Sequence, residues 1–169
     1  FSPVRGMLGL NGERWVPIHA VFPMGDWKRV VEANEEFFAE RRDFMERHGI
    51  IYSVMTMTVG TEFFLEPAFY WNDEITPLHV RSVGEDVVRP WMDRKANVAA
   101  RNAVAELRAA TQDLYASLGG VNWQVARDYP FRAVLAVPGW ALLEAVKHSL
   151  DPKGLMNPGS LGLALDVSR

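Results

Sequence analysis

The chain has 169 residues, of which 49% are hydrophobic and 23% are charged, and its formal net charge is −3. These values are ordinary for a globular domain, and a weakly acidic chain is a poor match for nucleic acid or an anionic membrane. The chain has no cysteine, which excludes disulfides, thiolate metal sites and a cysteine nucleophile. No apolar run approaches the roughly 20 residues of a transmembrane helix. We therefore expect a cytoplasmic protein without a membrane span.

The amino-terminal part of the sequence predicts a strand followed by a long helix. Residues 14–22 are rich in β-branched and aromatic side chains, and Pro17 indicates an edge position or a bulge. Apolar residues then recur at helical spacing over 26–48. Asp26 is a suitable N-cap for this helix, and Gly49 is a suitable stop.

A hairpin and a second helix are predicted next. Apolar and polar side chains alternate over residues 50–58, and residues 63–71 are mostly apolar and aromatic. A short Gly-Thr turn joins the two segments, which is typical of an antiparallel hairpin. A polar, irregular stretch follows, with a short helical turn expected at 85–91. The second long helix is predicted over 95–118, and residues 121–137 have extended character.

This order predicts an α+β fold. A βαββαβ pattern is typical of a ferredoxin-like antiparallel sheet with two long helices on one face, here followed by a C-terminal helix and a docking tail. The other face of such a sheet would carry apolar and aromatic side chains without a cover. We expect that face to meet a second subunit or another domain, and we expect the chain to form a homo-oligomer.

The carboxy-terminal segment predicts a helix that ends sharply and a tail with fixed turns. An apolar stripe runs to Leu150, and Asp151-Pro152 ends the helix because a residue before proline disfavours the α region. Asn157-Pro158-Gly159 is a turn signal. The tail also contains several leucines, so we expect it to be docked against another surface.

The run from Lys147 to Gly159, KHSLDPKGLMNPG, closely resembles the C-terminal signature of FAD-linked oxidases, the vanillyl-alcohol oxidase and p-cresol methylhydroxylase superfamily. Residues 14–19, 64–71 and 126–132 resemble, less sharply, segments of that family's cap domain. The resemblance implies a cap that lays its sheet over the flavin and a segment that returns to an FAD-binding domain. We accordingly divide the chain into a cap, 1–137, and a C-terminal helix and tail, 138–169.

The FAD-binding half of such an enzyme is absent from this sequence. No Gly-x-Gly-x-x-Gly loop is present to cradle a pyrophosphate. The resemblance therefore implies that FAD is held mainly by another domain or subunit, which would be the main partner, and that this chain alone is inactive. The metal-containing branch of the family has a His-x-His-Pro motif that is missing here, and the four histidines are scattered, so we expect no metal.

Candidate site residues come from four parts of the chain. Arg132 lies in an apolar stretch and is either a structural ion-pair partner or a bidentate clamp for a carboxylate or phenolate. His19 is either a proton acceptor or a satisfied core histidine. An aromatic wall for the substrate would consist of Tyr70, Trp71 and Tyr129. The turn that the resemblance places beside the flavin consists of Asn157, Pro158 and Gly159. In the phenol-oxidising branch a tyrosine precedes the arginine, whereas here Phe131 does.

These observations lead to two hypotheses. The first is the cap and substrate-binding portion of a flavin-dependent oxidoreductase. It would oxidise a small alcohol, a 2-hydroxy acid or a phenolic alcohol by hydride transfer to FAD. The second is a non-catalytic ferredoxin-like domain that dimerises or binds a ligand.

Overall fold

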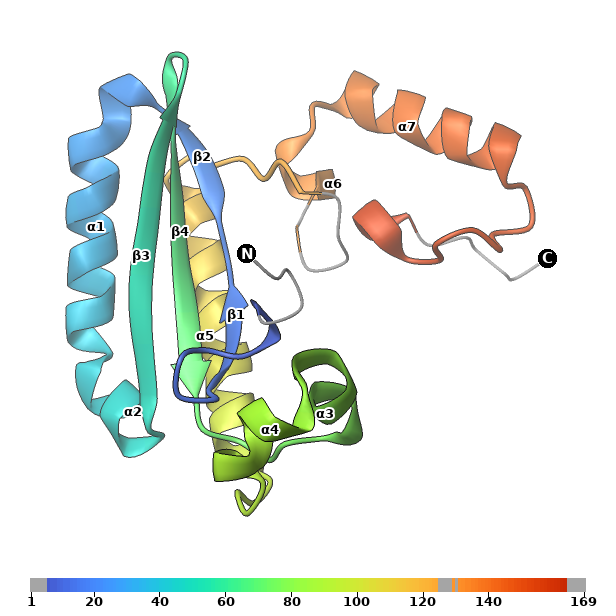
Figure 1. The fold of residues 1–169 in the computed structure, drawn as a ribbon. Helices are drawn as coiled ribbons and strands as arrows, with labels where there is room; N and C mark the ends of the chain where they lie inside the picture. The colour runs from blue at the N-terminus through green and yellow to red at the C-terminus, as the bar shows by residue number, and fades with distance from the viewer. Residues whose placement is uncertain (1–5, 125–128, 130, 164–169) are drawn as a thin grey trace.

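The computed structural model describes residues 6–124, 129 and 131–163, and its centre is an antiparallel sheet (Figure 1). The strands are β1 (Arg14–Pro17), β2 (Ala20–Pro23), β3 (Ile50–Val59) and β4 (Glu62–Trp71). β4 is central, with β3 along one side and β1 and β2 along the other. The predicted hairpin and the predicted α+β class are both confirmed.

β1 and β2 behave as one strand with a short gap. Pro17 pairs with Ala68 and Ala20 pairs with Leu65, so the register is the same before and after the gap. The gap falls opposite Pro67, which has no N–H to donate to the ladder. The predicted strand over 14–22 is therefore confirmed, with an interruption that leaves its alternation of faces intact.

Helices α1 (Trp27–Glu40) and α2 (Arg42–Arg47) occupy the region predicted as one helix, with a break at Arg41. Helix α5 (Val98–Ser117) begins where the Asn97 side chain accepts a 3.0 Å hydrogen bond from the amide of Ala100, an N-cap contact. The short η2 (Met24–Asp26) leads into α1, and α3 (Pro77–Val83), α4 (Glu85–Val88) and η3 (Arg89–Trp91) lie between β4 and α5. The helical turn at 85–91 is confirmed, whereas α3 was not expected.

α1 and α5 cover one face of the sheet. The core between them contains large apolar side chains from both layers, including Val30, Phe37, Phe38, Val104, Leu107, Phe63, Leu65 and Phe69. Because side chains alternate along a strand and paired residues share a face, the opposite face can be assigned from the register. We call it the open face, and it carries Trp15, His19, Ile51, Ser53, Met55, Met57, Val59, Phe64, Glu66, Ala68 and Tyr70.

The extended segment predicted over 121–137 is wrong for most of its described length. Val121 forms a single antiparallel bridge with Val21, and α6 (Phe131–Val134) is helical. Residues 125–128 and 130 of that prediction lie outside the described residues. A bridge of one residue leaves most of the expected fourth strand without a partner to pair with, so its β-branched side chains do not decide the local structure.

Helix α7 (Val137–Leu150) and η4 (Ser160–Gly162) complete the chain, and Figure 1 shows them to the side of the sheet, beyond α6. Helix α7 ends at Asp151, as the Asp-Pro signal predicts. Among the described residues, no helix is both long enough and apolar enough to cross a bilayer.

Candidate functional site

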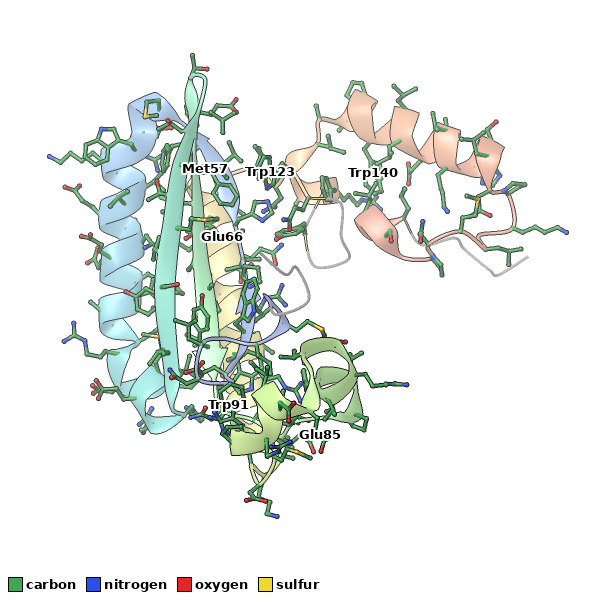
Figure 2. The ribbon with its side chains drawn as sticks, viewed as in Figure 1. Met57, Glu66, Glu85, Trp91, Trp123 and Trp140 are labelled. Carbon is green, nitrogen blue, oxygen red and sulfur yellow. The ribbon has the colours of Figure 1, made fainter. Side chains whose placement is uncertain are left out.

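His19 and Tyr129, two of the sequence-predicted site residues, meet on the open face although 110 positions separate them. The phenolic oxygen of Tyr129 lies 2.7 Å from His19 Nδ1, and both residues are buried. The imidazole is stacked on Phe64, with ring centroids 5.3 Å apart. It also makes an edge-to-face contact with Trp123, with ring centroids 6.0 Å apart. Trp123 itself lies beside the sheet next to β2 (Figure 2).

Three hydrogen bonds fix the protonation pattern of this pair. The amide of Trp123 donates to His19 Nε2 at 3.4 Å, so Nε2 is an acceptor. The hydroxyl of Tyr129 donates its proton to Gln124 Oε1 at 3.3 Å, so in the 2.7 Å contact with His19 its oxygen is the acceptor. All three bonds form together only when a neutral His19 carries its proton on Nδ1 and donates it to Tyr129.

Burial keeps His19 neutral. It lowers the pKa of this imidazole to about 4, because the charged form would lose its hydration. With Nδ1 donating and Nε2 already accepting, the ring is a weak proton acceptor in this arrangement. His19 is therefore better suited to orienting the Tyr129 hydroxyl than to acting as the base.

A carboxyl group shares the open face with His19. The common register of β1 and β2 places His19 opposite Glu66, which puts their β-carbons about 5 Å apart. Burial raises the pKa of Glu66, which makes the group a better proton acceptor when ionised. In the sequence Glu66 is an isolated carboxylate, because His19 is 47 positions away. The two residues become neighbours only through the strand pairing.

Tyr70 and Trp71 do not lie together. Tyr70 is on the open face, stacked on Trp15 with centroids 6.3 Å apart, and it lines a cavity of about 470 Å³ under the loop of residues 6–13. Trp71 points to the helix side, because consecutive residues of a strand face opposite ways. Its Nε1 donates to Asp73 at 3.1 Å.

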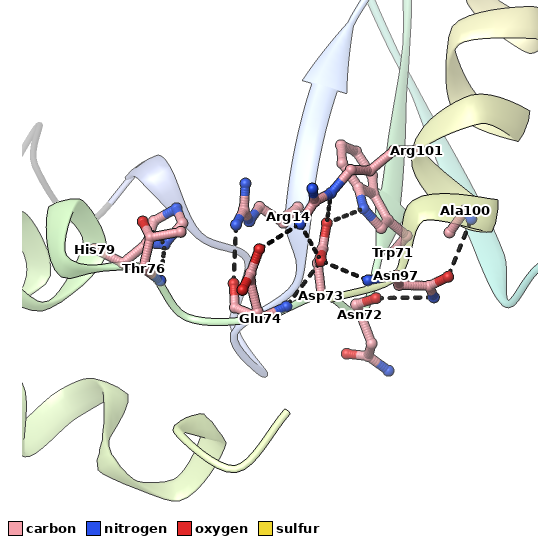
Figure 3. A network of polar contacts seen from close by, with 10 residues as sticks. All are labelled: Arg14, Trp71, Asn72, Asp73, Glu74, Thr76, His79, Asn97, Ala100 and Arg101. Atoms are coloured by element: carbon pink, nitrogen blue, oxygen red, sulfur yellow. Dashed lines mark hydrogen bonds and ion pairs between the residues drawn. The ribbon is translucent and has the colours of Figure 1, made fainter. Parts of the chain in front are cut away.

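That contact belongs to a polar network at the end of β4, shown in Figure 3. The carboxylate of Asp73 accepts from Arg101 Nε at 2.7 Å and Nη2 at 2.8 Å, and also from the amides of Glu74 and Asn97. Burial alone would raise the pKa of Asp73, but these bonds outweigh it and hold the pKa well below its usual range. The network is a structural clamp that joins β4 to the start of α5.

Arg132 lies on α6 rather than in an extended segment. Its side chain is exposed, and its guanidinium carbon is 5.2 Å from the centre of the Trp140 ring, a cation–π contact. Within the described residues Arg132 makes no salt bridge.

The tail is held by one carboxylate. Asp151 accepts hydrogen bonds from the amides of Leu155 and Met156, both at 2.9 Å, and from Lys147 Nζ at 2.5 Å. The bond from Lys147 is the main cause that holds the pKa of Asp151 below its usual value. Asn157 (φ 45°) and Gly159 (φ 79°) adopt left-handed backbone, and Asn157 lines a cavity of about 280 Å³ between α7 and the tail.

The described residues contain no group of three potential metal ligands. They also contain no glycine-rich loop leading into a helix that could cradle a pyrophosphate. What they offer a flavin is the exposed turn at Asn157 and Pro158, beside the exposed apolar side chains of Leu155 and Met156. Exposed apolar side chains of this kind suit contact with an aromatic ring rather than with a phosphate.

Comparison with known proteins agrees on this C-terminal segment. Residues 134–161 match the family described as "FAD linked oxidases, C-terminal domain". The matched stretch, which contains α7 and the turn held by Asp151, supports an FAD-linked oxidase C-terminal domain.

One curated relative, "Isoamylase 2, chloroplastic" from Oryza sativa subsp. japonica, is 31% identical over 78 residues, which cover 43% of this chain and 10% of the relative. The chain therefore spans about a tenth of that protein's length. No solved structure matches the chain significantly.

Proposed function

We propose that the chain is the cap and C-terminal portion of a flavin-dependent oxidoreductase that oxidises a small alcohol, a 2-hydroxy acid or a phenolic alcohol. The observation that carries the proposal is the match over 134–161 on an ordered helix and turn. FAD, bound mainly by another domain or subunit, would supply the hydride acceptor. Asn157, Pro158 and Gly159 would lie against the flavin side of that partner.

The chain's own residues would bind and orient the substrate. The hydroxyl of Tyr129, fixed by His19, would donate to a substrate oxygen in place of Gln124, whose 3.3 Å bond is long and easily exchanged. Tyr70 would supply an aromatic wall on the same face. Trp71 has no such role here because it contributes to the clamp around Asp73.

Arg132 would hold the anionic end of the substrate. Its exposed guanidinium has no carboxylate partner among the described residues and offers a planar two-pronged donor fork. A lysine would keep the charge and lose the fork. We expect Arg132→Lys and Arg132→Met to lower kcat/KM by roughly 30- to 1000-fold for an anionic substrate, the loss of about 2–4 kcal/mol.

The test uses the chain joined to its FAD-binding partner. Anaerobic bleaching of the flavin band is followed with 2-hydroxy acids, small alcohols and phenolic alcohols. Arg89→Met, which removes an exposed arginine from η3, is the matched control. If no substrate of these classes bleaches the flavin, the proposed function fails. Equal losses for charged and uncharged substrates would leave Arg132 without its anion-binding role.

A further inference from the structure

Strand β3 forms an uncovered edge of the sheet. It pairs only with β4, through ten consecutive residue pairs without a bulge. Every residue from Ile51 to Val59 is exposed, although six of these nine side chains are large and apolar. Among the described residues, no strand or helix pairs with its other side. A row of backbone N–H and C=O groups is therefore left without partners.

The sequence of β3 has none of the features that normally protect an edge. Proteins block edge strands with lysine, proline, bulges or short length. Residues 50–59, IIYSVMTMTV, contain no charged residue, no proline and no glycine. This strand is also ten residues long, whereas an average strand has about five or six. Such an edge is a template for the addition of another strand.

The outward-facing groups can be assigned from the hairpin. Gly60 and Thr61 form a two-residue turn, so Val59 and Glu62 are a hydrogen-bonded pair, and hydrogen bonding then alternates along the ladder. The even-numbered residues of β3 consequently turn their N–H and C=O away from β4. Pro67 agrees with this assignment, because its partner Val54 is a position where no N–H is needed from β4.

We propose that two copies of this chain pair through β3, antiparallel, about a two-fold axis perpendicular to the sheet near Met55. Such an axis keeps the same face of both sheets on the same side and places even-numbered residues opposite even-numbered residues, as the outward hydrogen bonds require. The axis also places Met55 opposite its own copy, so the residue at that position must tolerate an identical neighbour. A strand without charge meets this condition, since no like charges are opposed.

This pairing uses the edge of the sheet and goes beyond the proposed function, because the open face with His19 and Tyr129 stays available. A strand from a different protein would have to supply a neutral, unbroken segment of its own. A second copy supplies it automatically and satisfies the outward groups of both strands at once.

The first test measures the mass of the full chain by analytical ultracentrifugation over a concentration series. We expect a dimer. Met55→Lys and Met55→Glu should each weaken it at least 30-fold, because like charges would face each other across the axis. An equimolar mixture of the two variants should restore the dimer. Met156→Lys, at an exposed methionine of the tail, is the control and should dimerise normally.

The second test separates edge pairing from contact through the open face. Amide hydrogen exchange should show Tyr52, Val54, Thr56 and Thr58 becoming protected as the chain dimerises, since these amides point outward. Val54→Pro removes one outward donor without touching the ladder to β4 and should weaken the dimer. A monomeric wild-type chain, no restoration on mixing, or a dimer without this alternating protection would overturn the proposal.

Discussion

The clamp around Asp73 should be the most sensitive polar site for stability. The carboxylate is buried and accepts five hydrogen bonds, two of them from Arg101. Asp73→Asn keeps the shape but turns an amide against the guanidinium. Each charge-assisted bond is worth about 1.5–3 kcal/mol, and breaking a buried pair costs about 3–5 kcal/mol. We expect a loss of about 3–4 kcal/mol in the free energy of unfolding.

The measurement is urea denaturation followed by far-UV circular dichroism, with the slope of the transition compared between variants. Glu74→Gln is the matched control, because Glu74 also contacts Arg101 but its side chain is 42% exposed. That change should cost under about 1 kcal/mol. If Asp73→Asn costs no more than Glu74→Gln, the network does not stabilise the fold and the reasoning is refuted.

Two further predictions concern buried positions. Between pH 6.5 and about 4 the unfolded chain protonates His19 and the folded chain does not, so about 3 kcal/mol of stability should be lost across that range. His19→Gln should lack this part of the pH dependence. Gly120→Ala should lower the free energy of unfolding by about 1–3 kcal/mol, because the new β-carbon would lie 2.6 Å from the Phe22 ring. Gly25→Ala is the control, since its β-carbon would meet nothing within 4 Å. Thermal melts should show a lower Tm for Gly120→Ala than for Gly25→Ala.

Local patterns predicted much of the fold, because they depend on neighbouring residues. The hairpin, the helix after Asn97 and the stop at Asp151 follow from alternation, helical spacing and turn residues, and all three are observed. Thr76 followed by Pro77 was a missed signal, since a capping threonine before proline marks the start of α3.

The candidate site was less accessible to sequence reasoning because its contacts join distant segments. Asp73 and Arg101 are 28 positions apart, and nothing in either neighbourhood indicates the other. His19 was a candidate base from its apolar surroundings, but its hydrogen bonds to Tyr129 and Trp123 occupy both ring nitrogens. Arg132 lies in an apolar stretch that favours a strand, yet among the described residues no strand pairs with this segment, which forms α6.

The shared register of β1 and β2 has a consequence for how the sheet assembles. Because the offset against β4 is the same on both sides of the gap, pairing of either half aligns the other without a slip. The β3–β4 hairpin needs only contacts close in sequence and can form within microseconds, whereas the strand over 14–23 pairs with residues about 40 to 60 positions away. Whichever half arrives first therefore guides the second, so the proline gap does not create a competing misfolded alignment.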